Sequence, residues 1–219
     1  MKLFLEDIAK ILYAVPTTLG MAFVILLGGI VLGTAVAAGK TSGQKALTAI
    51  SRIYISYIRG IPLIVHIYIL YYLLPSEISN VFVLIVAYTL YSAACQAENV
   101  RTAINSVPKG QYEAAYCVGM SKPQAFFRII LPQAMTVLLP ILLNVYLGII
   151  KGLSLAFTIS VVDILAQAKL CSAENFAYIQ AYLAAAVVYW GICIGLTAIF
   201  NKLEAGLYRK KGLKLQAVQ

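Results

Sequence analysis

Five long apolar runs alternate with short polar gaps along this chain. The runs lie at about 11–38, 50–74, 81–97, 129–150 and 178–200. An apolar run of about 18 or more residues can cross a bilayer as a helix, and the third run reaches that length if it extends to residue 100. The pattern therefore predicts an all-α integral membrane protein with about five transmembrane helices.

A sixth apolar stretch, 153–168, is interrupted by Ser154, Thr158, Ser160 and Asp163. These polar residues favour a re-entrant or interfacial segment over a full span. The first run is much longer than the 7–15 residue core of a signal peptide, so we expect it to be retained as a span.

Composition supports a membrane environment. Of the 219 residues, 62% are hydrophobic and 11% are charged, whereas a soluble domain averages about half apolar and a quarter charged. The net charge of +9 does not indicate a nucleic-acid partner, because a nucleic-acid binder gathers its basic residues on one soluble face. Here they lie in short gaps between apolar runs, so the partner they indicate is the lipid bilayer.

The basic residues also predict an orientation, because short cytoplasmic loops carry an excess of Lys and Arg. Three segments hold most of them: Lys40, Lys45 and Arg52; Arg101, Lys109, Lys122 and Arg128; and Lys202, Arg209, Lys210, Lys211 and Lys214. We therefore expect an external N-terminal segment (1–14), a cytoplasmic C-terminus with a basic tail (208–219), and a multi-pass protein of the cytoplasmic membrane.

The long polar segment 100–128 contains signals for two helices. Pro108 suits a helix start and Gly119 a helix end, which predicts a short helix over about 108–119. Ser121 and Gln124 then fit a capping box that begins the helix leading into the fourth span. The two helices would form a knuckle at the inner face. An ordinary amphipathic interfacial helix is the alternative.

Residues in this segment resemble a known family. Glu113-Ala114-Ala115, then Gly119, then Ile130-Leu131-Pro132 are similar to the EAA loop of ABC-importer permeases. The surrounding motifs resemble the polar amino-acid branch, the histidine/glutamine/arginine/cystine type; they are 59–63, 97–101, 106–111 and 131–134. The similarity runs from about residue 17 to residue 207.

The resemblance implies a type I ABC importer transmembrane domain over 15–207, with a coupling helix at about 108–119. It implies that Glu113, Ala114, Ala115 and Gly119 dock into an ABC ATP-binding subunit, present in two copies. It further implies a second permease subunit in a homodimer, an extracytoplasmic solute-binding protein, and alternating access driven by ATP. ATP and Mg would be held by the partner subunit, so no cofactor is expected in this chain.

The sequence departs from the branch at three places. Ile61 replaces a usual Thr, His66 replaces a usual Gln, and 151–155 replaces a usual Lys-Asp-Thr-Ser-Leu. These departures lie where a substrate passage is expected, so the resemblance leaves the transported amino acid open. The segment 151–157 and the pair Tyr189-Trp190 look slightly more like cystine importers.

Polar residues inside apolar runs are candidates for function, because an ionisable group in hydrocarbon is costly unless it is paired or wetted. Arg59 precedes Pro62, which removes a backbone donor and predicts a broken second span. Arg59 either lines a pathway or pairs with Glu98 or helix carbonyls. His66 is either a packed core residue or a pathway contact. Further pathway candidates are Asn144, Lys151 and Ser154.

Glu98 and Arg101 are three residues apart, which predicts a structural ion pair on one helix face. The chain has no GxxxxGK[ST] phosphate loop, no nucleophile–base constellation and no CxxC, so we expect neither a catalytic nor a metal site. Two other classes stay open. A stand-alone secondary transporter would require internal repeats, and a membrane anchor for an enzyme would leave the broken second span unexplained.

Overall fold

A computed structural model describes residues 2–211, except for the side chains of 175, 203 and 206–211. Within this part the chain is almost entirely helical and contains no strand, which confirms the predicted all-α class. Four of its described helices are long and apolar enough to cross a membrane, or five if the bent pair α3 and α4 forms one span. The basic tail predicted at 208–219 lies mostly outside the described residues.

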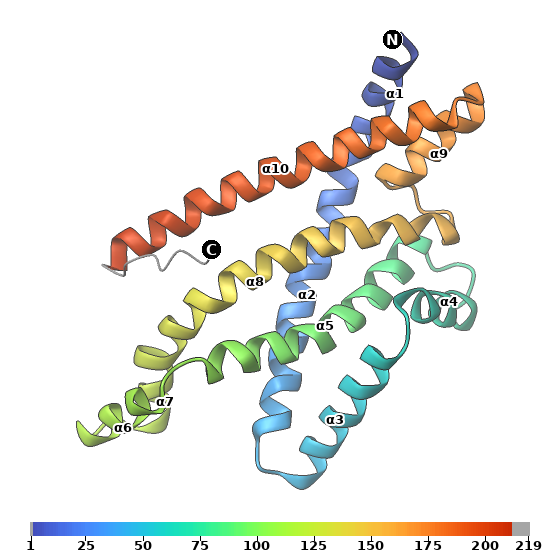
Figure 1. The fold of residues 1–219 in the computed structure, drawn as a ribbon. Coiled ribbons are helices and arrows are strands. Elements are labelled where there is room, and N and C mark those ends of the chain that lie inside the picture. Colours follow the sequence, from blue (N-terminus) through green and yellow to red (C-terminus); the bar gives the residue numbers. More distant parts are fainter. Residues whose placement is uncertain (1, 212–219) are drawn as a thin grey trace. The chain divides into compact units, whose positions relative to one another are not determined.

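The chain divides into two compact units, residues 19–161 and residues 1–18 with 162–219. The larger unit holds most of α2 and the following elements through η2 (Figure 1). Their bounds are α2 Val15–Thr41, α3 Lys45–Gly60, α4 Leu63–Leu73, α5 Asn80–Asn105, α6 Lys109–Cys117, α7 Lys122–Ala125, π-helix η1 Phe126–Ile130, α8 Leu131–Gly152 and 3-10 helix η2 Leu153–Ile159.

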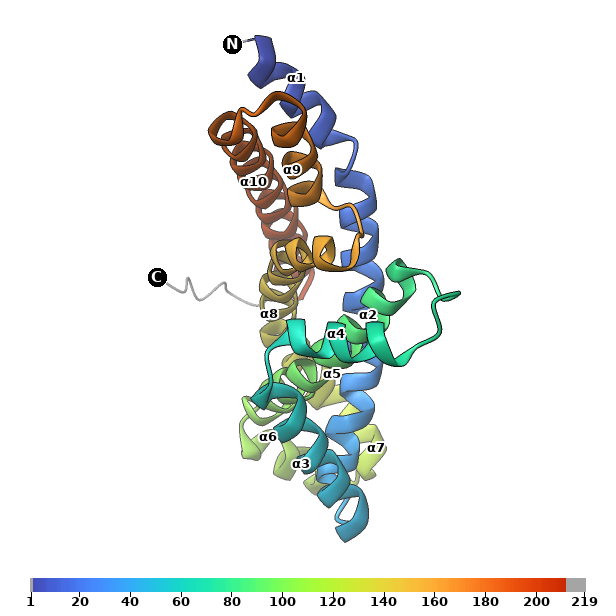
Figure 2. The same ribbon diagram turned by 90° about the vertical axis from the view of Figure 1, so that its right-hand side faces the viewer.

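The second apolar run is broken where Pro62 predicted a break. Helix α3 ends at Gly60, Ile61 is extended, and Pro62 caps the start of α4. The two helices meet at 103°, so α4 turns sharply away from α3 (Figures 1 and 2). The sequence indicated the break but not this angle.

Helices α2 and α5 approach closely because small residues face each other. A Cβ built on Gly33 would lie 2.7 Å from the Cβ of Gln96 and 2.8 Å from the carbonyl oxygen of Ala93. Gly28 and Gly29 face Thr89 and Ser92 in the same way. A side chain at these glycines would push the helices apart, which is why small residues are common where membrane helices contact each other.

Two hydrogen bonds fix the ends of the larger unit. The Tyr146 hydroxyl on α8 donates to the Leu19 carbonyl at 3.1 Å, and the Asn80 side chain at the start of α5 donates to the Ile159 carbonyl at 2.8 Å. After η2, Ser160 adopts a left-handed conformation with φ 60°. The apolar stretch 153–168 is therefore a short 3-10 helix, a turn and the first residues of a further helix that begins at Ile164, not one continuous helix.

The smaller unit packs α1 (Lys2–Leu12) against α9 (Ile164–Asn175) and α10 (Tyr178–Lys211). The N-terminal segment that we expected to precede the first span is thus itself a helix, separated from α2 by a turn at residues 13–14. Its core consists of Ile11, Ala14, Ile164, Ala168, Ala184, Ala185 and Val188.

Asp163 holds the start of α9. Its carboxylate accepts hydrogen bonds from the backbone N–H of Ala166 and Leu165 and from the Tyr189 hydroxyl. Burial raises the pKa of Asp163, while these three donors act in the opposite direction. The side chain therefore has a structural role as a helix cap.

Candidate functional site

The short helix α6 begins and ends as the sequence predicted. Pro108 is its N-cap residue, and Gly119 has a φ of 80°, in the left-handed region. The N–H of Met120 donates to the Ala115 carbonyl at 3.1 Å, and the N–H of Gly119 donates to the Tyr116 carbonyl at 3.0 Å. These two bonds form a Schellman motif, which terminates the helix and turns the chain.

The next helix starts directly after this turn. The Ser121 N–H donates to Oε1 of Gln124 at 3.0 Å, so the predicted capping box is present. Helix α6 packs on α7 and η1. The amide of Gln133 on α8 also donates to Oε1 of Gln111 on α6 at 3.2 Å. These contacts fix α6 to the first turn of α8, so the two helices can move together.

One face of α6 is buried in its own chain. Tyr112 packs against a core of α2, α3, α5, η1 and α8 residues, and burial raises the pKa of its hydroxyl. Ala115 is 4% exposed. The Ala115 methyl group is therefore packed within this chain and helps seat α6, and its role in docking to an ATP-binding subunit stays a prediction.

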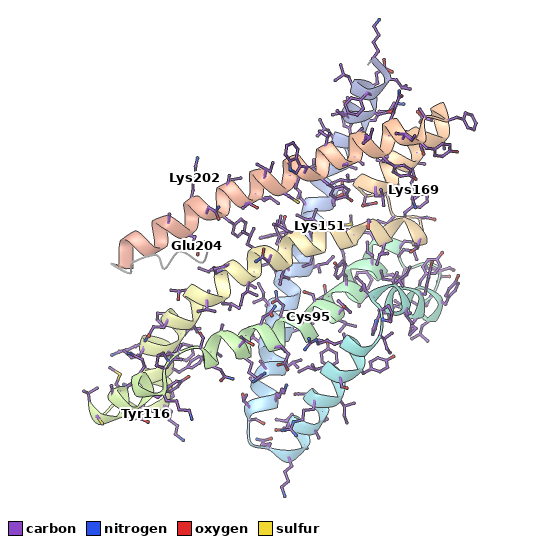
Figure 3. The ribbon with its side chains drawn as sticks, in the orientation of Figure 1. Cys95, Tyr116, Lys151, Lys169, Lys202 and Glu204 are labelled. Carbon is purple, nitrogen blue, oxygen red and sulfur yellow. The ribbon has the colours of Figure 1, made fainter. Side chains whose placement is uncertain are left out.

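The other face of α6 is open. Glu113, Ala114 and Gly119 are exposed, and so are Tyr116 (45%) and Val118 (73%). Figure 3 shows Tyr116 on α6, far from Lys151 in the last turn of α8. Sequence reasoning did not single out Tyr116 or Val118, although apolar residues in a short polar helix were a signal. We call Glu113, Ala114, Tyr116, Val118 and Gly119 the α6 surface.

The ion pair predicted between Glu98 and Arg101 is confirmed. Arg101 donates to Oε2 of Glu98 from Nε at 3.0 Å and from Nη2 at 2.9 Å. The other carboxylate oxygen accepts from the Lys40 ammonium at the end of α2, 58 residues away in sequence. Glu98 is thus shared by two cations and ties α2 to α5. Its partner Lys40 was not foreseen.

Arg59 does not use this carboxylate. It is exposed beside the α3–α4 break, and among the described residues it has no ion-pair partner. The alternative that Arg59 pairs with Glu98 is therefore wrong for this conformation, because Lys40 and Arg101 occupy both oxygens.

His66 is buried beside two tyrosine rings. Its ring packs edge-on against Tyr57 at 5.8 Å and Tyr91 at 6.1 Å between ring centres, and Nδ1 lies 3.2 Å from the Pro62 carbonyl oxygen. Nε2 is buried and has no hydrogen-bond partner in the described part of the chain. Because Tyr91 also contacts Tyr88, whose hydroxyl donates to the Gly148 carbonyl at 3.5 Å, these rings connect the break to α8.

The remaining candidates follow one side of α8. Asn144 and Lys151 are exposed, seven residues apart and so on one helix face, with Gly148 between them. Ser154 is partly buried in η2. In the described part of the chain no hydrogen bond or ring contact joins these residues directly to Arg59 or His66, so the structure places them in two groups. The described residues also contain no cluster of His, Cys, Asp or Glu that would hold a metal ion.

Comparison with known proteins identifies a family model. Residues 29–208 match the family described as binding-protein-dependent transport system inner membrane component. The chain is 37% identical over 209 residues to a probable amino-acid ABC transporter permease protein PatM of Vibrio harveyi, covering 93% of this chain and 94% of that protein. It is 36% identical over 205 residues to the L-cystine transport system permease protein TcyB of Bacillus subtilis, covering 91% and 85%.

Solved structures agree on the fold. A crystal structure of an amino acid ABC transporter with histidines matches with a TM-score of 0.83 and 26% identity, covering 90% of this chain and 94% of that one. An inward-facing MetNI methionine ABC transporter matches with a TM-score of 0.74 over 90% and 95% of the chains. At 18% identity this second likeness concerns the fold alone.

Proposed function

This chain belongs to the family of binding-protein-dependent transport system inner membrane components, and on this premise we propose how it carries its solute and how it is driven. It is the transmembrane permease subunit of an ATP-driven ABC importer for an amino acid. The substrate that we propose is a polar amino acid, with cystine as a candidate because relatives include an L-cystine permease. The secondary-transporter and membrane-anchor alternatives gain no support from these relatives.

The α6 surface is the observation that supports transport driven by a separate ATP-binding subunit. It presents one carboxylate, small residues and two exposed apolar side chains at the end of a rigidly seated helix. We propose that an ABC ATP-binding subunit docks here. Closure of two such subunits around ATP would move α6, and the Gln111–Gln133 contact would pass that movement to α8. The translocation path would then alternate between its outward-open and inward-open states.

The proposed assembly contains a homodimer of this permease, two ATP-binding subunits and an extracytoplasmic solute-binding protein. The chain itself is non-catalytic in this proposal, and ATP and Mg are bound by the partner subunit. Glu98 and Arg101 serve as a structural pair. Arg59 and His66 at the α3–α4 break, with Asn144, Lys151 and Ser154 along α8, are proposed to line the solute pathway.

Reconstitution with the cognate ATP-binding subunit tests the proposal. Gly119→Asp and Glu113→Lys place an acid or reverse a charge on the α6 surface, so both should reduce copurification of the ATPase and ATP-dependent uptake. Glu77→Lys is a matched control, because Glu77 is also exposed but lies in the turn between α4 and α5. Full ATPase binding and full uptake by both α6 variants would refute the docking site.

We also propose that the N-terminus is external and the C-terminus cytoplasmic. Cys117 on α6 reports on this, because all four cysteines are described and Cys117 is the exposed one. A membrane-impermeant maleimide should label Cys117 in inside-out vesicles and not in intact cells. A cysteine introduced at Glu77 should show the reverse. Labelling of Cys117 in intact cells would overturn the orientation.

A further inference from the structure

The turn that joins α2 to α3 borders a shallow, open basic hollow of ≈ 470 Å³. Lys40, Lys45 and Arg52 line it together with Thr41 and Thr48, and no carboxylate does. Lys40 is held by Glu98. Lys45 and Arg52 are exposed, and within the described structure neither has an ion-pair partner. The hollow therefore presents two cations without a counter-charge.

The start of α3 strengthens this positive potential. The 16-residue helix has no side-chain cap at Gln44 and no acidic residue in its first turn. Lys45 occupies that turn instead, at the helix end where the backbone dipole is already positive. A cation at this position is unfavourable for the helix alone, and a bound anion would relieve both the dipole and the charge repulsion.

A second hollow of ≈ 420 Å³ adjoins the first, because Arg52 lines both. Its other lining residues are Ile53, Ser56 and Tyr57, one turn farther along α3. Ile53 is 69% exposed, and Ile50 beside it is 64% exposed. The basic hollow thus continues into a shallow, open groove with a mainly apolar lining, in the direction in which α3 runs toward its break.

We propose that these two hollows bind an anionic glycerophospholipid. The Arg52 guanidinium and the Lys45 ammonium would donate to the phosphodiester oxygens, whereas the hydroxyls of Thr41 and Thr48 donate to the carbonyls of Ala37 and Lys40 in their own chain. One acyl chain would follow Ile53 and Tyr57. Charge complementarity favours this occupant, because the unpaired cations Lys45 and Arg52 match an anionic headgroup. The apolar residues lie one turn farther along α3, where an acyl chain attached to that headgroup would reach them. The proposal rests on the cytoplasmic placement of the α2–α3 turn given above.

Binding is measured on the assembled transporter, purified in a detergent without phospholipid and titrated with dioleoyl phosphatidylglycerol or dioleoyl phosphatidylcholine. Native mass spectrometry counts the bound lipid. Lys45→Gln and Arg52→Gln should each weaken phosphatidylglycerol binding about fivefold, as expected for one basic group at an anionic lipid surface. Lys202→Gln, an exposed lysine on α10, is the matched control and should leave binding unchanged. Phosphatidylcholine should bind more weakly than phosphatidylglycerol to the wild type.

Ile53→Asn tests the groove separately from the charge. It should weaken binding of dioleoyl phosphatidylglycerol but not of glycerophosphoglycerol, which lacks acyl chains. The proposal is overturned if both basic variants bind phosphatidylglycerol as the wild type does, or if inorganic phosphate at equal concentration displaces the lipid. It is also overturned if the variants separate the permease copies without changing lipid binding, since the occupant would then be a second copy.

Uptake distinguishes this failure from failure of the proposed function. A wild-type transporter that imports its solute with ATP but binds no lipid at Lys45 and Arg52 refutes only the lipid site. A reconstituted wild type without ATP-dependent uptake refutes the importer instead.

Discussion

Adding one methyl group at Gly33 should separate α2 from α5. The Cβ of Gly33→Ala would lie 2.7 Å from Cβ of Gln96, 2.8 Å from the Ala93 carbonyl oxygen and 3.0 Å from the Ala97 nitrogen. Gln96, Ala93 and Ala97 are almost fully buried, and two of the contacts are to backbone, so no flexible side chain can give way. Overpacking of this kind costs about 1–3 kcal/mol.

Gly20→Ala in the same helix is the matched control, because a Cβ there meets nothing within 4 Å. Both substitutions gain about 1 kcal/mol of helix propensity, so their difference isolates the cost of overpacking. For a chain of this size 1 kcal/mol shifts the melting temperature by about 2–4 °C. Purified Gly33→Ala should therefore melt roughly 2–12 °C below Gly20→Ala in thermal unfolding followed by circular dichroism. A Gly33→Ala variant that melts with or above the control would refute the close packing of α2 on α5.

Three further changes test other parts of the chain. Gly119→Ala should lower the free energy of unfolding by about 1–2 kcal/mol, because its φ of 80° is left-handed. It should also reduce the amount of ATPase that copurifies, whereas Gly110→Ala in α6 should not. Asp7→Val should raise the melting temperature by the equivalent of about 1–3 kcal/mol, since it removes two buried carboxylate oxygens that lack a hydrogen-bond partner among the described residues; a fall would contradict this. Glu98→Gln should lower the free energy of unfolding by about 2 kcal/mol in denaturant titrations, because two cations lose their shared carboxylate. The ion pair of Glu174 with Lys10 is half-exposed, so Glu174→Gln is the control and should change the free energy of unfolding less than Glu98→Gln does.

Local chemistry determined much of this structure from the sequence alone. Pro62 disrupts the helix locally, because it has no N–H to donate to the carbonyl four residues back. Gly119 and Ser121 end one helix and begin the next through bonds to residues three to five positions away. Glu98 and Arg101 pair because one helical turn brings them together. The helical membrane class could also be predicted locally, because the length of each apolar run is a property of that segment alone.

Contacts between distant segments were decided by the tertiary structure. Lys40 reaches Glu98 across 58 residues, and this contact occupies the carboxylate that was one of the alternative partners for Arg59. Ala114 and Ala115 belong to the same sequence motif, but only the packing of α6 shows that Ala115 is buried while Ala114 is exposed. The 103° bend after α3 and the rings around His66 likewise depend on which helices meet. A single sequence reports what each residue does to its own turn of helix. It does not report which other helix lies beside that turn.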